Sequence, residues 1–71
     1  MKRVAKIYNE HGTYYGDIYF HAFTKRFTVC HRGCAHCYAA ETIEEVEEFL
    51  TSEKRPYWVH EIKYLKSFKR A

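Results

Sequence analysis

Apolar and polar residues alternate along the first thirty residues in a way that predicts three strands. The strands are expected at residues 4–8, 13–23 and 26–30, where β-branched and aromatic side chains are frequent. Residues 9–12, Asn-Glu-His-Gly, have the composition of a tight turn, because Asn and Gly tolerate left-handed backbone. Residues 24–25 then form the tip of a two-residue hairpin.

Side-chain alternation within this hairpin predicts a register and two different faces. If Phe23 lies opposite Arg26, then Phe20 lies opposite Val29. One face is then apolar and forms the core: Ile18, Phe20, Ala22, Phe27 and Val29. The other face is unusually aromatic for a surface open to water, so it is either covered or binds something: Tyr15, Asp17, Tyr19, His21, Phe23, Arg26, Thr28 and Cys30.

The clearest single element is a helix that begins after Thr42. Thr42 is suited to cap the backbone, and Glu45 follows three residues later, as in a capping box. Apolar residues recur at helical spacing and give one face that can pack on a sheet: Ile43, Val46, Phe49 and Leu50.

Residues 57–65 fit either a strand or a helix, and the strand is favoured. Tyr57, Trp58 and Val59 have high β propensity and follow Pro56, which biases its predecessor to extended backbone. The expected order is β-β-β-α-β. This predicts a single α+β domain over residues 1–71, a small two-layer fold in which one helix packs on an antiparallel sheet of three to four strands. A Cys/His loop is expected between the third strand and the helix.

Composition and charge narrow the class of protein. A chain of 71 residues buries only about 60% of its unfolded surface, so its core is expected to be marginal without a staple. Residues 1–38 carry six Lys/Arg against two acids, residues 39–54 six acids against one Lys, and residues 55–71 five Lys/Arg against one acid.

We find no membrane-length apolar run and no signal-peptide pattern, so a cytoplasmic location is expected and a membrane partner is not. No small-molecule substrate is evident.

The most informative segment is residues 30–37, in which five of eight side chains are Cys or His. Its C-x3-C-x2-C spacing predicts a zinc ion bound by Cys30, Cys34, Cys37 and a fourth ligand, because structural zinc takes four N or S donors. His36 is the preferred fourth ligand, and the alternatives are His31, His21 and His60. A protein without any metal is the other possibility.

The run from Cys30 to Tyr38 also resembles the cluster motif of radical S-adenosylmethionine enzymes, in which three cysteines hold a [4Fe-4S] cluster. The resemblance spans nine residues, and the family's chemistry resides in an α/β barrel several times longer than this chain. What the resemblance implies here is an iron–sulfur cluster as the alternative cofactor. Separately, residues 34–37 form a C-x-x-C ahead of a helix, the place of the redox pair in thioredoxin-like proteins, which gives thiol–disulfide exchange as an alternative activity.

These patterns predict a non-enzymatic, zinc-stapled binding module. A protein partner is favoured, and a small regulator or inhibitor, of the kind that viruses and mobile elements encode, has this size and charge segregation. Nucleic acid is the alternative partner, because sheet aromatics beside cations can stack bases and contact phosphates. The residues expected to bind either partner are Tyr15, Tyr19, Phe23, Lys25, Arg26, Arg32, Lys66, Lys69 and Arg70.

Overall fold

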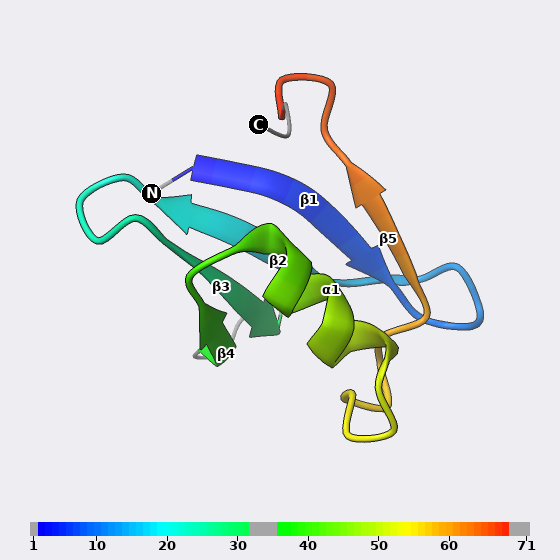
Figure 1. Cartoon of the computed structure of the whole chain (residues 1–71). Helices are drawn as coiled ribbons and strands as arrows, with labels where there is room; N and C mark the ends of the chain where they lie inside the picture. Colours follow the sequence, from blue (N-terminus) through cyan, green and yellow to red (C-terminus); the bar gives the residue numbers. More distant parts are fainter. Residues whose placement is uncertain (1, 32–35, 69–71) are drawn as a thin grey trace.

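The structure, a computed structural model, describes residues 2–31 and 36–68, and for His36 and Cys37 it describes the backbone alone (Figure 1). Within these residues, one helix and five strands form a small α+β domain. The sheet is antiparallel throughout, with the strand order β4-β3-β2-β1-β5. The elements are β1 (Lys2–Tyr8), β2 (Tyr14–His21), β3 (Arg26–His31), β4 (His36–Ala40), α1 (Ile43–Thr51) and β5 (Glu61–Tyr64).

The main departure from the expected order is β4, which occupies part of the segment assigned to a Cys/His loop. Tyr38 and Ala40 lie opposite Val29 and Phe27 of β3, so their alternation continues the core face of the sheet. The Cys and His residues that precede them conceal this alternation in the sequence. The strand forms because β3 offers it a row of backbone hydrogen-bonding groups, which sequence pattern does not show.

The β2–β3 hairpin has a longer turn than expected. Phe20 lies opposite Phe27 and His21 opposite Arg26, so the predicted pairing of Phe23 with Arg26 is wrong by two residues. A two-residue primed turn requires special backbone angles that Thr-Lys does not favour. The observed turn instead places only Lys25 at positive φ, 61°, and its N–H donates to the His21 carbonyl over 2.8 Å. Ile18, Phe20, Phe27 and Val29 keep the predicted core face, because a shift of two residues leaves every paired side chain on its face. Ala22, which was expected on the same face, is instead exposed in the turn.

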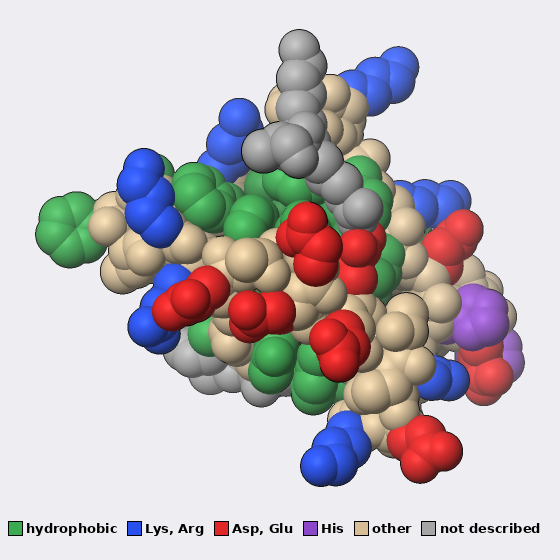
Figure 2. Space-filling model, in the orientation of Figure 1, with side chains coloured by type: hydrophobic (Ala, Val, Ile, Leu, Met, Phe, Trp, Pro, Cys, Tyr) green, Lys and Arg blue, Asp and Glu red, His purple; other side chains and the backbone are tan. Residues whose placement is uncertain are grey.

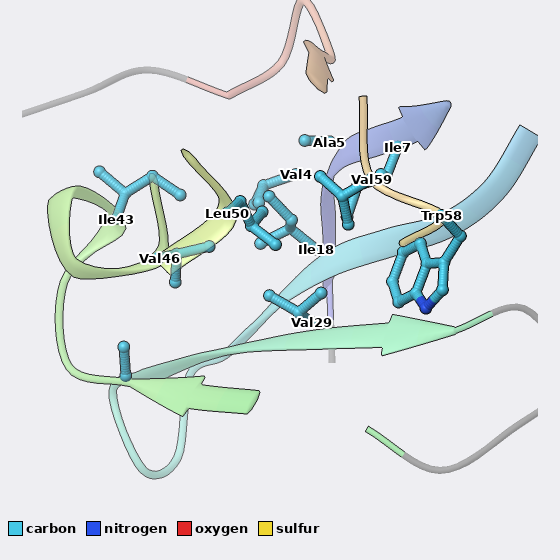
Figure 3. Packing of buried hydrophobic residues seen from close by; sticks show 11 residues of the cluster. Val4, Ala5, Ile7, Ile18, Val29, Ile43, Val46, Leu50, Trp58 and Val59 are labelled. Atoms are coloured by element: carbon cyan, nitrogen blue, oxygen red, sulfur yellow. The ribbon is translucent and has the colours of Figure 1, made fainter. Parts of the chain in front are cut away.

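The core lies between α1 and one face of the sheet (Figure 3). As predicted, the helix begins after Thr42, whose hydroxyl accepts the N–H of Glu45 over 3.2 Å. Three residues of its predicted apolar stripe are buried and Phe49 is half-buried. The buried core comprises Val4, Ala5, Ile7, Ile18, Val29, Ala40, Ile43, Val46, Leu50, Trp58 and Val59.

The predicted strand over residues 57–65 is confirmed only at Glu61–Tyr64. Trp58 and Val59 precede this strand, and their side chains are buried in the core. They lie in a turn in which the Val59 N–H donates to the Pro56 carbonyl, so the pairing with β1 begins only after them. Trp58 packs directly on Gly16, where an added Cβ would lie 2.7 Å from Cζ3 of the indole. The indole therefore takes the space that a side chain at position 16 would fill.

Two shifts in the β1–β2 register change which face some residues occupy. One lies between Arg3 and Ala5, and the other leaves Tyr15 without a partner between the pairs Ile7–Gly16 and Tyr8–Tyr14. Because of the second shift, Tyr15 packs against the core, with its ring 5.7 Å from that of His31. The expectation that Tyr15 shares a face with Asp17 is therefore wrong.

Candidate functional site

The sheet face opposite α1 gathers tyrosines and cations. Register pairs place Lys6 beside Asp17 and Lys63, and Arg3 beside Tyr19, while the residues that alternate with them enter the core. The described helix and the segments that carry Trp58 and Phe68 all pack on the core side, so none of them covers this face. We define the tyrosine face as Arg3, Lys6, Tyr8, Tyr14, Asp17, Tyr19 and Lys63.

A buried carboxylate organises the centre of the tyrosine face. Asp17 is 5% exposed, and the hydroxyl of Tyr14 donates to its Oδ1 over 2.5 Å. Arg3 Nε lies 3.4 Å from the same oxygen, and the Tyr19 hydroxyl lies 3.5 Å from Oδ2. A buried charge is tolerated when it is paired and hydrogen-bonded in this way. Asp17 therefore holds Tyr14, Tyr19 and Arg3 in place.

The same contacts change how two of these groups titrate. Burial raises the pKa of Tyr14 to about 12, and its hydrogen bond to the negative Asp17 adds to this effect. The charge of Asp17 also raises the pKa of Arg3. Tyr14 is therefore a neutral hydrogen-bond donor, and Arg3 a fixed cation, at any physiological pH.

Two lysines lie over tyrosine rings at the β1–β5 side of this face. Lys63 Nζ is 5.1 Å from the ring centre of Tyr8, and Lys6 Nζ is 5.7 Å from that of Tyr14. The two rings are themselves 5.9 Å apart and inclined by 47°. Such distances are those of cation–π contacts. On this part of the face, each of the two tyrosine rings therefore has a lysine ammonium group beside it that comes from a neighbouring strand.

The opposite side of the molecule is acidic. Glu44, Glu45 and Glu48 are exposed on α1, and Figure 2 shows acidic side chains gathered over the helix. The exposed glutamates of α1 therefore lie on the core side of the sheet, away from the tyrosine face. A polyanion would be repelled from the helix side and attracted to the tyrosine face.

The structure distributes the predicted binding residues over several places. Tyr19 lies on the tyrosine face, and Arg26, at the start of β3, has its Nη2 3.9 Å from a carboxylate oxygen of Glu41. Phe23 and Lys25 lie in the exposed β2–β3 turn, and Lys66 is exposed after β5. Arg32, Lys69 and Arg70 lie outside the described residues.

Sequence reasoning missed most of the tyrosine face. Lys6 and Tyr8 alternate with Ile7 in β1, which was the available signal. Tyr14 lies on the tyrosine face because of the register shift at Tyr15, and Lys63 lies there because it pairs with Lys6. Alternation along the sequence predicts neither the register shift nor the strand pairing.

The cysteine segment lies at the β3–β4 side of the sheet. Cys30 is half-buried, and its Sγ lies 3.9 Å from the hydroxyl oxygen of Thr28. The backbone register places His36 opposite Cys30. Cys34 lies outside the described residues, as do the side chains of His36 and Cys37. Among the side chains that are described, no three of His, Cys, Asp and Glu form a group able to hold a metal ion.

Of the other candidate histidines, His31 and His60 lie away from Cys30, whereas His21 lies near it. His31 follows Cys30 in β3 and points to the other face, where its ring lies 5.1 Å from that of Trp58. Within the part of the chain that the structure describes, its buried Nδ1 has no hydrogen-bond partner. His60 precedes β5, at the far edge of the sheet. His21 shares the face of Cys30, but its Nε2 lies 2.8 Å from the hydroxyl oxygen of Thr28.

Comparison of the chain with protein families, curated proteins and solved structures found no match. In the described part of the chain, no helix has the length and apolar character needed to span a membrane. The tyrosine face and the cysteine segment are therefore the two features from which a function is inferred.

Proposed function

We propose that the protein binds single-stranded nucleic acid on its tyrosine face. The observation that carries this proposal is that three tyrosines and three cations share a sheet face that no described helix covers. Aromatic side chains on such a surface stack with bases, each worth about 1–3 kcal/mol, while nearby cations contact the phosphates. Tyr8 and Tyr14 are the stacking residues nearest to Lys6 and Lys63.

Arg3 is the proposed phosphate anchor. Asp17 and Arg3 are joined through Nε, and a guanidinium has further N–H groups that can donate to phosphate oxygens. A cation that is already oriented loses less conformational entropy on binding. Lys6 and Lys63 supply further positive charge beside it, so the backbone of the nucleic acid is expected to run across β2, β1 and β5.

The charge of the whole molecule supports one orientation. The glutamates of α1 lie on the side opposite the tyrosine face, so a strand of nucleic acid approaching the helix is repelled. The net charge of the protein is only +3. The local positive charge of the tyrosine face can nevertheless attract a nucleic acid, because local charge steers association more than total charge does.

The test is a titration of a fluorescently labelled, mixed-sequence single-stranded oligonucleotide over a series of salt concentrations. Lys6→Gln is expected to weaken binding and to lower the salt slope by about one, since one phosphate contact is lost. Lys2→Gln is the matched control, because Lys2 is in the same strand and borders an apolar hollow on the core side. Tyr8→Ala is expected to weaken binding by about 1–3 kcal/mol.

Absence of binding at low salt would contradict the proposal. Equal losses for the Lys6 and Lys2 variants would also contradict it, since they would indicate attraction to net charge rather than to this face.

A protein partner is the second candidate, and Phe23 is the residue that favours it. Its side chain is 99% exposed at the β2–β3 turn, where an aromatic residue can anchor an interface. A photo-crosslinker at position 23 should then capture one defined protein of the source cell, and a crosslinker at the exposed Glu10 should not. In that case the protein acts as a small regulator or inhibitor, without catalysis of its own.

For the cysteine segment we propose a structural zinc ion, held by Cys30, Cys34, Cys37 and His36. The support is the register of β3 and β4, which places His36 opposite Cys30 while His31 faces the core. Thiolate ligands suit a reducing compartment, so the cytoplasm is the proposed location. An iron–sulfur cluster and a C-x-x-C redox pair are the alternatives. A coloured purified protein would indicate the cluster, and catalytic reduction of a model disulfide would indicate the redox pair.

A further inference from the structure

The outer edge of β4 is open for pairing. β4 is the last strand on its side of the sheet, and within the described residues no backbone hydrogen bond joins Tyr38, Ala39 or Ala40 to a segment other than β3. In an antiparallel pair, alternate residues direct their N–H and C=O groups away from the partner strand. β4 therefore offers donors and acceptors to a further strand.

The two edges of the sheet differ in their protection. β5 carries Glu61 and Lys63, and charged side chains on an edge discourage further pairing. The described side chains of β4 carry no charge. Among the described side chains, the β4 edge is therefore the one without charges.

Beside this edge lies a hollow between β4 and α1. It has a volume of about 260 Å³ and is bordered by Tyr38, Phe49, Ser52, Glu45 and Glu48. The rings of Tyr38 and Phe49 stack, with centres 4.1 Å apart and an interplanar angle of 5°. An aromatic surface bordered by two carboxylates is complementary to a side-chain pair of which one is apolar and the other basic.

We infer that the β4 edge and this hollow together bind an extended peptide segment of a partner protein that is rich in apolar and basic residues. The segment adds a strand to β4 through its main chain. On the α1 side it places an apolar side chain over Tyr38 and Phe49, and a Lys or Arg beside Glu48. This surface is separate from the tyrosine face, so the inference does not depend on nucleic-acid binding.

A second copy of the chain is a poorer occupant than such a peptide. Pairing of two β4 strands about a two-fold axis perpendicular to the sheet puts both helices on the same side. The hollows bordered by Glu45 and Glu48 would then lie near each other, and like charges would repel. A basic segment converts this repulsion into attraction.

The experiment uses the whole protein and the octapeptide Val-Val-Lys-Lys-Val-Val-Lys-Lys, with an acetylated N-terminus and an amidated C-terminus. When this peptide is extended as a strand, valine and lysine side chains alternate along each of its two faces. Binding is followed by NMR, and the amides of Tyr38, Ala39 and Ala40 are expected to shift most. Glu48→Lys should weaken binding about fivefold or more, since an attractive charge becomes repulsive. Glu44→Lys is the matched control, because it changes the net charge equally on the same helix but does not border the hollow. Its binding should change by less than about twofold.

Three results would overturn the inference. The first is the absence of any shift at β4 with excess peptide, and the second is equal weakening by the two charge reversals. The third is a sedimentation equilibrium in which the wild-type protein self-associates and Glu48→Lys abolishes the association, which would assign the edge to a second copy. The same octapeptide with two of its residues replaced by proline should not bind, since proline cannot donate to the added ladder.

Discussion

At the scale of single residues, the most constrained position is Gly16. A Cβ at this position would lie 2.6 Å from the carbonyl oxygen of Cys30 and 2.7 Å from the indole of Trp58. The first of these atoms belongs to the backbone of the paired strand, so it cannot move aside without disturbing the sheet. Gly16 is thus required by packing, whereas Gly12, at φ 79°, is required by its turn.

We expect Gly16→Ala to lower the free energy of unfolding by about 1–3 kcal/mol through overpacking. The measurement is urea denaturation monitored by the fluorescence of Trp58. Gly12→Ala is a useful comparison, since a Cβ at position 12 would meet no atom within 4 Å, and its cost of about 1 kcal/mol should come from backbone strain alone. Wild-type stability of Gly16→Ala would show that the indole does not pack on this residue.

The hydrogen bond between Tyr14 and Asp17 predicts a pH dependence. The phenol of Tyr14 has a pKa of about 12 in the folded protein against an ordinary value of 10.0. Between these values the unfolded chain has lost this proton and the folded chain has kept it, so the unfolded state binds fewer protons. Stability is therefore expected to fall as the pH rises from about 10 to about 12, and this group contributes no dependence below that range.

Asp17→Asn should lower the pKa of Tyr14 but not return it fully to its ordinary value, because burial is the largest cause of the rise. NMR titration of ring-labelled tyrosine measures this directly. A titration of Tyr14 that is unchanged in Asp17→Asn would contradict the contact.

At the scale of elements, α1 depends on its cap. A helix of nine residues is too short to be stable alone, and the hydroxyl of Thr42 satisfies one of its free N–H groups. Thr42→Ala is expected to cost about 1 kcal/mol, and Thr42→Ser should restore most of it. Thermal unfolding followed by circular dichroism tests both variants. If serine were no better than alanine, the loss would come from the threonine methyl group rather than from capping.

At the scale of the whole molecule, a small core makes the proposed zinc ion decisive for folding. Chelation should lower the melting temperature by more than about 10 °C, because a structural zinc contributes several kcal/mol and each shifts the melting of a small domain by about 4–8 °C. Elemental analysis should give one zinc per chain. Cys30→Ser is expected to lose the metal, whereas His31→Gln, on the opposite face, should keep it.

A metal-free protein that melts identically with and without chelator would rule the zinc site out. Cys30 and His31 both lie in β3, but only Cys30 is a proposed ligand. Loss of zinc in Cys30→Ser but not in His31→Gln would therefore come from loss of the ligand and not from misfolding of the strand.

What the sequence determined by itself was local. Apolar spacing and the Thr42 cap defined α1, and alternation assigned Ile18, Phe20, Phe27 and Val29 to one face even though the register was shifted by two residues. These predictions succeeded because they depend on periodicity and on hydrogen bonds between residues close in the chain.

Tertiary structure alone decided β4, the departure of Trp58 from the sheet, and the composition of the tyrosine face. Each depends on which strand lies beside which: β3 gives β4 its partner, Gly16 makes room for the indole, and the pairing of β1 with both β2 and β5 brings Lys6, Tyr14 and Lys63 together. Strand pairing and register shifts join residues far apart in the chain, and no pattern within a short window specifies them.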